Sequence, residues 1–167
     1  MTSEIRGEDQ VPPLVPSLVE RHVGCVALKI GQVIFRLLEA ELAQQLGLRI
    51  RHYSILGALS EGGPMSQQAI GNYLRIDSAT MVAAIDDLEQ RDLVRRERHQ
   101  DDRRRYVVTI TAQGEETLEA IGNLIDKFDS EHFADLTANQ QGQLHKLLEK
   151  LSRGTTLTTA YDRVRNG

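Results

Sequence analysis

Arginine is concentrated in one short segment of this chain. Residues 91–105 hold seven arginines and four acidic residues, whereas the whole chain of 167 residues carries a formal net charge of −4. The planar guanidinium fork binds phosphate well and is attracted to the negative potential of a narrow DNA minor groove. A run of charge is more often a solvated surface, so DNA binding depends on what the neighbouring residues predict.

The residues before this segment predict two short helices separated by a turn. Residues 62–64 (Gly-Gly-Pro) break the chain, and Ser66 is placed to cap a first helix. Its apolar stripe is Ala69, Ile70, Tyr73 and Leu74. Asp77 is a second capping residue, and Met81, Ile85 and Leu88 then recur on one face of a second helix.

The other face of the second helix carries mostly small and hydroxyl side chains. Its members are Ser78, Thr80, Val82, Ala83 and Asp86. Such a face allows a helix to lie deep in a DNA major groove, where hydroxyls bond to base edges and apolar groups touch the thymine methyl. The alternative interpretation is ordinary close packing of helices.

A hairpin follows the second helix. Leu93 and Val94 open one strand, and the alternation from Tyr106 to Ile110 is typical of a second. The arginines would lie at the tip, so the whole predicts a winged helix-turn-helix. We expect DNA contacts from both helices and the wing: Ser66, Gln67, Ser78, Ala79, Thr80, Val82, Ala83, Arg96, Arg98, Arg103, Arg104 and Arg105.

Residues 66–114 resemble the DNA-binding core of the MarR family of bacterial transcription regulators. The matching residues are Leu88-Glu89, Leu93-Val94, Asp102, Arg104, Thr111 and Gly114. The resemblance covers about residues 17–151 and implies that Arg104 enters the minor groove while Asp102 orients it. Asp92 stands where the family usually has glycine, so we expect a less tight turn before the wing.

The fold class we expect is mainly α with a small β-hairpin wing. Residues 1–16 are predicted to be a flexible arm, 17–47 and 111–151 a helical dimerisation region, 48–110 the winged domain, and 152–167 a tail. Residues 17–47 read as one long helix with Ser17 and Glu20 at capping-box spacing, and Thr137 and Gln140 have the same spacing before the last helix. The apolar stripe of the first helix is too wide for a monomer to bury, so a homodimer on a pseudo-palindromic operator is predicted.

A small-molecule effector is the expected signal, and the family resemblance implies repression relieved by it. A crevice lined by His22, Val26, Ile30, His52 and Tyr53 would suit small aromatic acids or phenols. The alternative is that these are core and surface residues with no ligand. The resemblance also aligns Cys25 with the sensing cysteine of a hydroperoxide-responsive branch, although a buried structural cysteine is the more common outcome.

Other classes of protein have less support. The histidines show no metal-ligand spacing, and no nucleophile motif or phosphate-binding glycine loop is present, so we expect no metal, no cofactor and no enzyme activity. No apolar run reaches membrane-spanning length, and we predict a cytoplasmic protein with no membrane partner. A winged module that binds protein instead of DNA, and an enzyme that uses a winged helix only to dimerise, stay open as alternatives.

Overall fold

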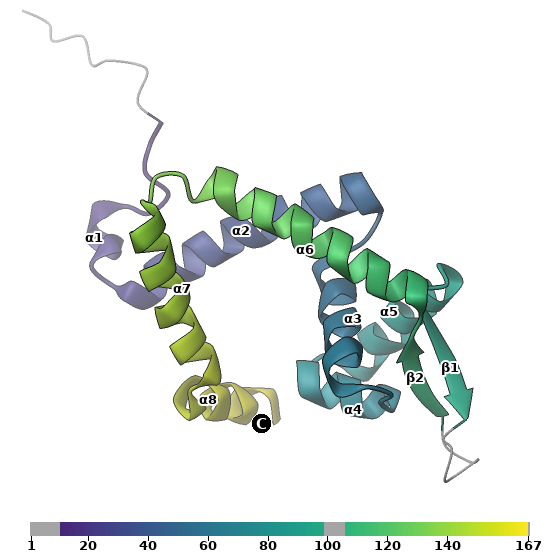
Figure 1. Ribbon diagram of the computed structural model, residues 1–167. Helices are drawn as coiled ribbons and strands as arrows, with labels where there is room; N and C mark the ends of the chain where they lie inside the picture. Colours follow the sequence, from purple (N-terminus) through teal and green to yellow (C-terminus); the bar gives the residue numbers. More distant parts are fainter. Residues whose placement is uncertain (1–10, 99–105, 167) are drawn as a thin grey trace, which may run out of the picture. The chain divides into compact units, whose positions relative to one another are not determined.

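The computed structural model describes residues 11–98 and 106–166 (Figure 1). The helices and strands are α1 Ser17–Glu20, α2 Val23–Leu46, α3 Ile50–Gly62, α4 Gln67–Leu74, α5 Ser78–Gln90, β1 Val94–Arg98, β2 Tyr106–Ile110, α6 Ala112–His132, α7 Ala138–Arg153 and α8 Thr155–Asn166. The expected class, mainly helical with a two-stranded wing, is confirmed. The chain divides into two compact units, with the boundary between Ile121 and Gly122.

The long first helix that the sequence predicted is wrong at its start. A single turn, α1, ends at Arg21, and His22 then takes an extended conformation before α2 begins. His22 is a weak helix former, and α1 buries no residue that could offset the break there. The predicted capping box is also absent, because Pro16 occupies the N-cap position and Ser17 lies inside the helix.

The core of the first unit gathers around α3 and α5. Helix α3 packs against α2, α4, α5 and β2, and α5 packs against β1. Fully buried aliphatic side chains come from each of these elements: Leu42, Ile55, Leu56, Leu59, Ile70, Met81, Ile85, Leu88, Val94 and Val108. The apolar face predicted for the second helix is therefore the face that anchors α5 in the core.

The wing is an antiparallel pair whose register runs from Val94 opposite Ile110 to Arg98 opposite Tyr106. A further short strand segment was not predicted. Met65 donates its backbone N–H to the Val108 carbonyl at 3.2 Å and accepts the Val108 N–H at 2.8 Å. This bridge ties Met65, two residues before α4, to strand β2 of the wing.

The turn between α5 and β1 is tight even though it lacks the glycine typical of the family. Asp92 adopts a left-handed backbone conformation with φ of 59°, and its N–H donates to the Glu89 carbonyl at 3.0 Å. The Leu93 N–H donates to the Leu88 carbonyl at the same distance. Our expectation of a looser turn was wrong, because aspartate is one of the few side chains that tolerate this conformation.

Replacing Asp92 with glycine is expected to stabilise the protein by about 0.5 kcal/mol, because glycine has no Cβ to crowd the left-handed conformation. Chemical denaturation of the purified variant would measure the change. Asp92→Ala is the matched control and should be less stable than either. A destabilised Asp92→Gly protein would show that the carboxylate contributes more than the strain costs.

Thr111 and Gly114 fasten the start of α6 to the end of the α5 turn. The Thr111 hydroxyl donates to the Asp92 carbonyl at 2.6 Å and accepts the Gly114 N–H at 3.0 Å. A Cβ on Gly114 would lie 2.1 Å from the Leu93 carbonyl oxygen. The threonine and glycine of the predicted motif are thus explained by one close approach of two backbone segments.

The second unit contains the rest of α6, then α7 and α8. The predicted capping box is confirmed at the start of α7, where Thr137 accepts the Gln140 N–H and the Gln140 side chain accepts the Thr137 N–H. The tail predicted for residues 152–167 is wrong, because α8 begins directly after Gly154. The spacing of Leu157, Tyr161 and Val164 is helical and was the missed signal. No helix in the described part of the chain is long and apolar enough to span a membrane.

Candidate nucleic-acid interface

Helix α5 presents its small-residue face away from the core. Asp77 caps it, accepting the Thr80 N–H at 2.9 Å, and this hydrogen bond lowers the pKa of the Asp77 carboxyl. Met81, Ala84, Ile85 and Leu88 are buried. Ser78, Ala79, Val82 and Ala83 are exposed, and Thr80 is half-buried. Most of this face is therefore exposed in the single chain. Close packing against other helices of the chain does not explain its small residues.

Helix α4 begins as predicted and departs from the prediction at its end. The Ser66 hydroxyl accepts the Ala69 N–H at 3.2 Å, so this side chain caps the helix. Ala69 and Leu74 are half-buried and Ile70 is buried, as the stripe requires. Tyr73 is 58% exposed and does not belong to that stripe, because it lies in the last turn of a helix only eight residues long.

Arg96 on β1 is held by acidic side chains of α5. Its guanidinium bonds to Asp86 at 2.6 Å and to Glu89, and the Glu89 carboxylate also accepts the Arg96 backbone N–H at 2.9 Å. Gln67 on α4 accepts a longer bond of 3.4 Å from the same guanidinium. Partial burial alone lowers the pKa of Arg96, but the two carboxylates outweigh it and hold the pKa above its ordinary value.

The other described arginines of the wing lie at the surface. Arg95 is paired with Glu97 at 2.7 Å, and the Arg98 guanidinium lies 5.8 Å from the centre of the Tyr106 ring. The predicted contacts Arg103, Arg104 and Arg105, and the orienting Asp102, lie outside the described residues.

His52 is not placed to line a ligand crevice. It is 4% exposed, and its Nδ1 accepts the Arg49 backbone N–H at 3.3 Å. Its Nε2 lies 3.5 Å from Asp87 of α5. Both ring nitrogens are engaged within the fold, so the side chain links α3 to α5. The predicted ligand role of His52 is corrected on this ground, while Tyr53 beside it is half-buried.

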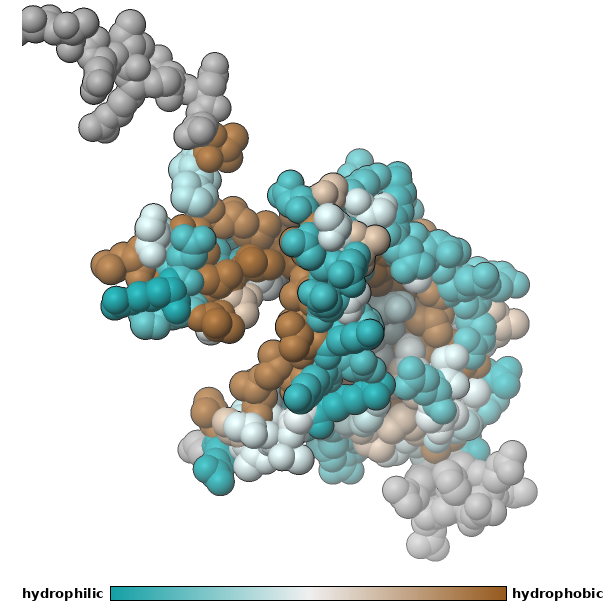
Figure 2. Space-filling view, turned by 60° about the vertical axis from the view of Figure 1, so that its left-hand side comes forward, coloured by the Kyte–Doolittle hydropathy of each residue, from teal (hydrophilic) through white to brown (hydrophobic). Residues whose placement is uncertain are grey.

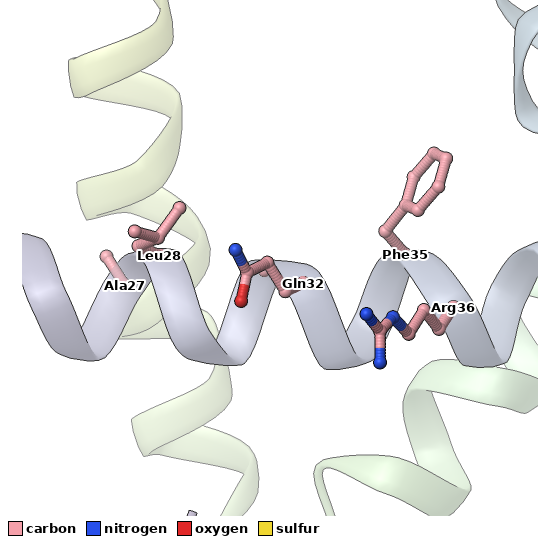
Figure 3. Close-up of a pocket in the computed structure, with 6 residues that line it drawn as sticks. Ala27, Leu28, Gln32, Phe35 and Arg36 are labelled. Atoms are coloured by element: carbon pink, nitrogen blue, oxygen red, sulfur yellow. The ribbon is translucent and has the colours of Figure 1, made fainter. Parts of the chain in front are cut away.

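A shallow hollow of about 480 Å³ runs along α2. It is lined by Ala27, Leu28, Gly31, Gln32, Phe35 and Arg36, and Figure 3 shows five of these labelled along one stretch of the helix. None of the five predicted crevice residues lines it. His22 precedes α2 and is exposed, whereas Val26 is half-buried and Ile30 exposed on the same helix.

Two further predictions from the sequence concern Cys25 and metal binding. Cys25 is exposed, which corrects the expectation that a cysteine among aliphatic neighbours is buried. The early part of α2 is exposed on most of its sides, so its aliphatic residues give no cover. Among residues 11–98 and 106–166, no group of three or more potential ligands could hold a metal ion.

These features define a winged helix-turn-helix DNA-binding protein, and comparison with known proteins agrees. The pattern of the MarR family matches residues 46–105. The chain is 34% identical over 119 residues to the uncharacterised HTH-type transcriptional regulator YwoH of Bacillus subtilis, covering 71% of this chain and 85% of YwoH. The transcriptional regulator BldR of Sulfolobus solfataricus has a similar structure, with a TM-score of 0.68, 28% identity, and coverage of 84% of this chain and 100% of BldR.

CouR of Rhodococcus jostii, crystallised with p-coumaroyl-CoA, shares the fold. Its TM-score is 0.66 at 22% identity, covering 83% of this chain and 96% of CouR. The chain belongs to the MarR family and is a DNA-binding transcriptional regulator, not an enzyme.

Proposed function

We propose that this regulator is a homodimeric repressor of pseudo-palindromic operators, released from DNA by a small aromatic or phenolic ligand. The observation that carries the proposal is the exposed face of α5, formed by Ser78, Ala79, Val82 and Ala83. This face begins at a capped helix N-terminus, beside a wing whose first strand packs on the same helix. Small side chains let a helix approach base edges closely.

Exposed apolar side chains outside the winged region support the homodimer. On α7 and α8 they are Leu147, Leu148, Leu151, Leu157, Tyr161 and Val164. Figure 2 shows further hydrophobic surface over the N-terminal helices, where Leu18, Val23, Leu28 and Phe35 are exposed. Apolar surface of this extent is typical of an interface. We assign dimerisation to residues 17–47 and 111–151, with α8 added, and DNA binding to residues 48–110.

A dimer explains how a ligand could control binding. Two readers related by a two-fold axis contact half-sites about 34 Å apart, one turn of DNA. A change in their spacing prevents both from fitting successive grooves at once, and a ligand that binds one spacing better shifts the population toward it. Repression would then end when the ligand favours the spacing that does not fit.

We place such a ligand in the hollow on α2. Leu28 and Phe35 offer apolar and aromatic surface, and Arg36 offers a cation for a carboxylate. In the shared fold, CouR binds the thioester of an aromatic acid. The composition of the hollow supports an aromatic acid or phenol as effector, and a ligand role for Val26, Ile30 and Tyr53 stays a prediction.

The decisive experiment is selection of binding sites from a pool of random DNA duplexes, followed by measurement of stoichiometry. We expect the pool to converge on an inverted repeat with half-sites one turn apart, bound by two chains per duplex. Light scattering without DNA should give a dimer. A monomer in solution, or a pool that stays random, contradicts the proposal and favours the protein-binding alternative.

Replacing Arg104 with alanine is expected to weaken binding to the selected operator about tenfold or more. It should also reduce the slope of log affinity against log salt by about one, because one cation near the DNA is lost. Fluorescence anisotropy across a salt series measures both quantities. Arg163→Ala is the matched control, since it removes the same charge in α8. An unchanged operator affinity in Arg104→Ala would remove the wing from the DNA interface.

The effector proposal has its own test. Titrating 4-hydroxybenzoate or p-coumarate into the protein–operator complex should release DNA, and Phe35→Ala should raise the concentration needed. Benzoate derivatives that release DNA equally well from the wild type and the Phe35→Ala variant would place the effector elsewhere. Release by hydrogen peroxide that Cys25→Ser abolishes would support the redox alternative.

A further inference from the structure

Arg96 on β1 contacts acidic side chains of another element. Its guanidinium reaches Asp86 and Glu89 on α5 and Gln67 on α4. Its side chain is 26% exposed, compared with 61% for Arg95 next to it on β1. Successive residues of a strand point to opposite faces, so Arg96 faces the helices and Arg95 faces away.

The charges around Arg96 are unfavourable for a DNA phosphate. One guanidinium is shared by two carboxylates, so the group carries a net charge of −1. A phosphate that approached would be repelled, or would have to displace an acidic side chain whose bond to Arg96 is already made. Ion pairs between partly buried groups are costly to break when one charge is left without its partner. Direct contact with DNA is therefore not the role that this geometry supports.

The same contacts join the three elements that must act together on DNA. Glu89 accepts a hydrogen bond from the Arg96 backbone as well as from its side chain, so both are fixed to α5. A planar guanidinium with bonds in several directions holds its neighbours in one orientation, which a flexible ammonium does not. The cluster lies where β1 leaves the core and the direction of the wing is set.

We propose that Arg96 is a positioning residue, which fixes the wing relative to the recognition helix α5 so that both fit one operator half-site. In this role Arg96 helps the protein to distinguish its operator from other DNA without contacting the DNA itself. Loss of the cluster should therefore weaken binding to the operator more than binding to unrelated DNA. This proposal rests on the DNA-binding function and replaces the contact role that the sequence suggested for Arg96.

The test compares Arg96→Met with Arg95→Met as the matched control from the same strand. Affinity is measured for the selected operator and for an unrelated duplex of equal length, each across a salt series. For Arg96→Met we expect about a tenfold or greater loss on the operator, a smaller loss on unrelated DNA from the two carboxylates left unpaired, and an unchanged salt slope. Equal losses on both duplexes, with a slope reduced by about one, would show that Arg96 contacts phosphate and would overturn the proposal.

Glu89→Ala provides a second test in which the two roles predict opposite signs. It removes a negative charge near DNA and leaves Arg96 paired with Asp86 alone, so the cluster becomes neutral and a phosphate-contacting Arg96 would bind the operator more tightly. A positioning Arg96 would lose its anchor, and operator affinity would fall. Glu97→Ala is the charge-matched control, because Glu97 pairs with Arg95 and not with Arg96.

Failure of the Arg96 proposal can be told apart from failure of the proposed function. A wild-type protein that selects no sequence contradicts specific operator binding itself, whereas the Arg96 proposal fails only if the wild type binds and the variants behave as phosphate contacts. Circular dichroism confirms folding of each variant before binding is measured. If Arg96→Met does not fold, Glu89→Ala decides the question, since its expected change in affinity has opposite signs under the two roles.

Discussion

Alanine at position 114 is expected to destabilise the protein by about 3 kcal/mol, near the upper end of the usual cost of overpacking a core. The new Cβ would lie 2.1 Å from the Leu93 carbonyl oxygen and 2.7 Å from the Ile110 side chain. The nearest atom belongs to the backbone and cannot rotate away. It also accepts the Thr111 N–H at 3.1 Å, so any shift that makes room weakens that bond.

Chemical and thermal unfolding measure this effect, and a loss of 3 kcal/mol corresponds to a fall in Tm of about 6 to 12 °C for a chain of this size. Gly57→Ala is the control. Gly57 lies inside α3 with no atom within 4 Å of a Cβ, so alanine there should stabilise by about 0.5 to 1 kcal/mol. If both substitutions change stability alike, the contact at Gly114 relaxes at little cost.

The winged region was the most predictable part of the fold. Its helices have polar capping residues at Ser66 and Asp77, and its apolar residues repeat at the helical or the strand period. These local signals agree with the tertiary packing, since the periodic face of α5 is the buried face. Agreement between local preference and packing is the condition under which sequence patterns predict structure well.

The predictions that were wrong depended on information that local patterns do not carry. Helix α1 ends after a single turn and buries none of its residues, and a capping-box spacing at Ser17 cannot reveal that. Asp92 keeps a turn that glycine would normally make, because its side chain tolerates a left-handed backbone. Helix α8 was missed because residues 152–167 were predicted to be a tail, although a helical repeat follows Gly154.

Local patterns predicted only part of the candidate site, because contacts between elements decide the rest. Exposure of the small residues on α5 follows from helical periodicity and was anticipated. The partners of Arg96 were not, because Gln67 lies 29 positions away in the sequence and contact across elements cannot be read from spacing. His52 was assigned to a ligand crevice from its residue type, yet its position between α3 and α5 makes it part of the core.

Substitution of His52 by alanine is expected to cost about 3 kcal/mol of stability, within the range for truncating a large buried side chain. The ring fills space between α3 and α5, and its loss leaves the Arg49 N–H without its acceptor, which adds to the cost. Ser54→Ala is the control from the same helix. The Ser54 hydroxyl bonds only to the Ile50 carbonyl one turn earlier, so its loss should change stability by less than about 0.5 kcal/mol.

His52 should also make the fold sensitive to acid. Burial lowers the pKa of the ring below 6.5; Asp87 opposes this, while Arg51, Arg91 and Arg49 reinforce it. The folded protein therefore holds the neutral ring, and the unfolded chain binds the proton more readily. The stability this contributes is fully present about one pH unit above 6.5 and is lost as the pH falls through and below 6.5, by at most about 1.4 kcal/mol at pH 5.5.

His52→Gln isolates this contribution, because glutamine retains a donor for Asp87 and does not titrate. The difference in free energy of unfolding between wild type and variant should be constant above about pH 7.5 and shrink on acidification. The remaining histidines and the carboxylates are common to both proteins, so their titration cancels in the difference. A difference that stays level down to pH 5.5 would mean that the folded protein protonates His52 as readily as the unfolded chain does, with the attraction of Asp87 cancelling the effect of burial.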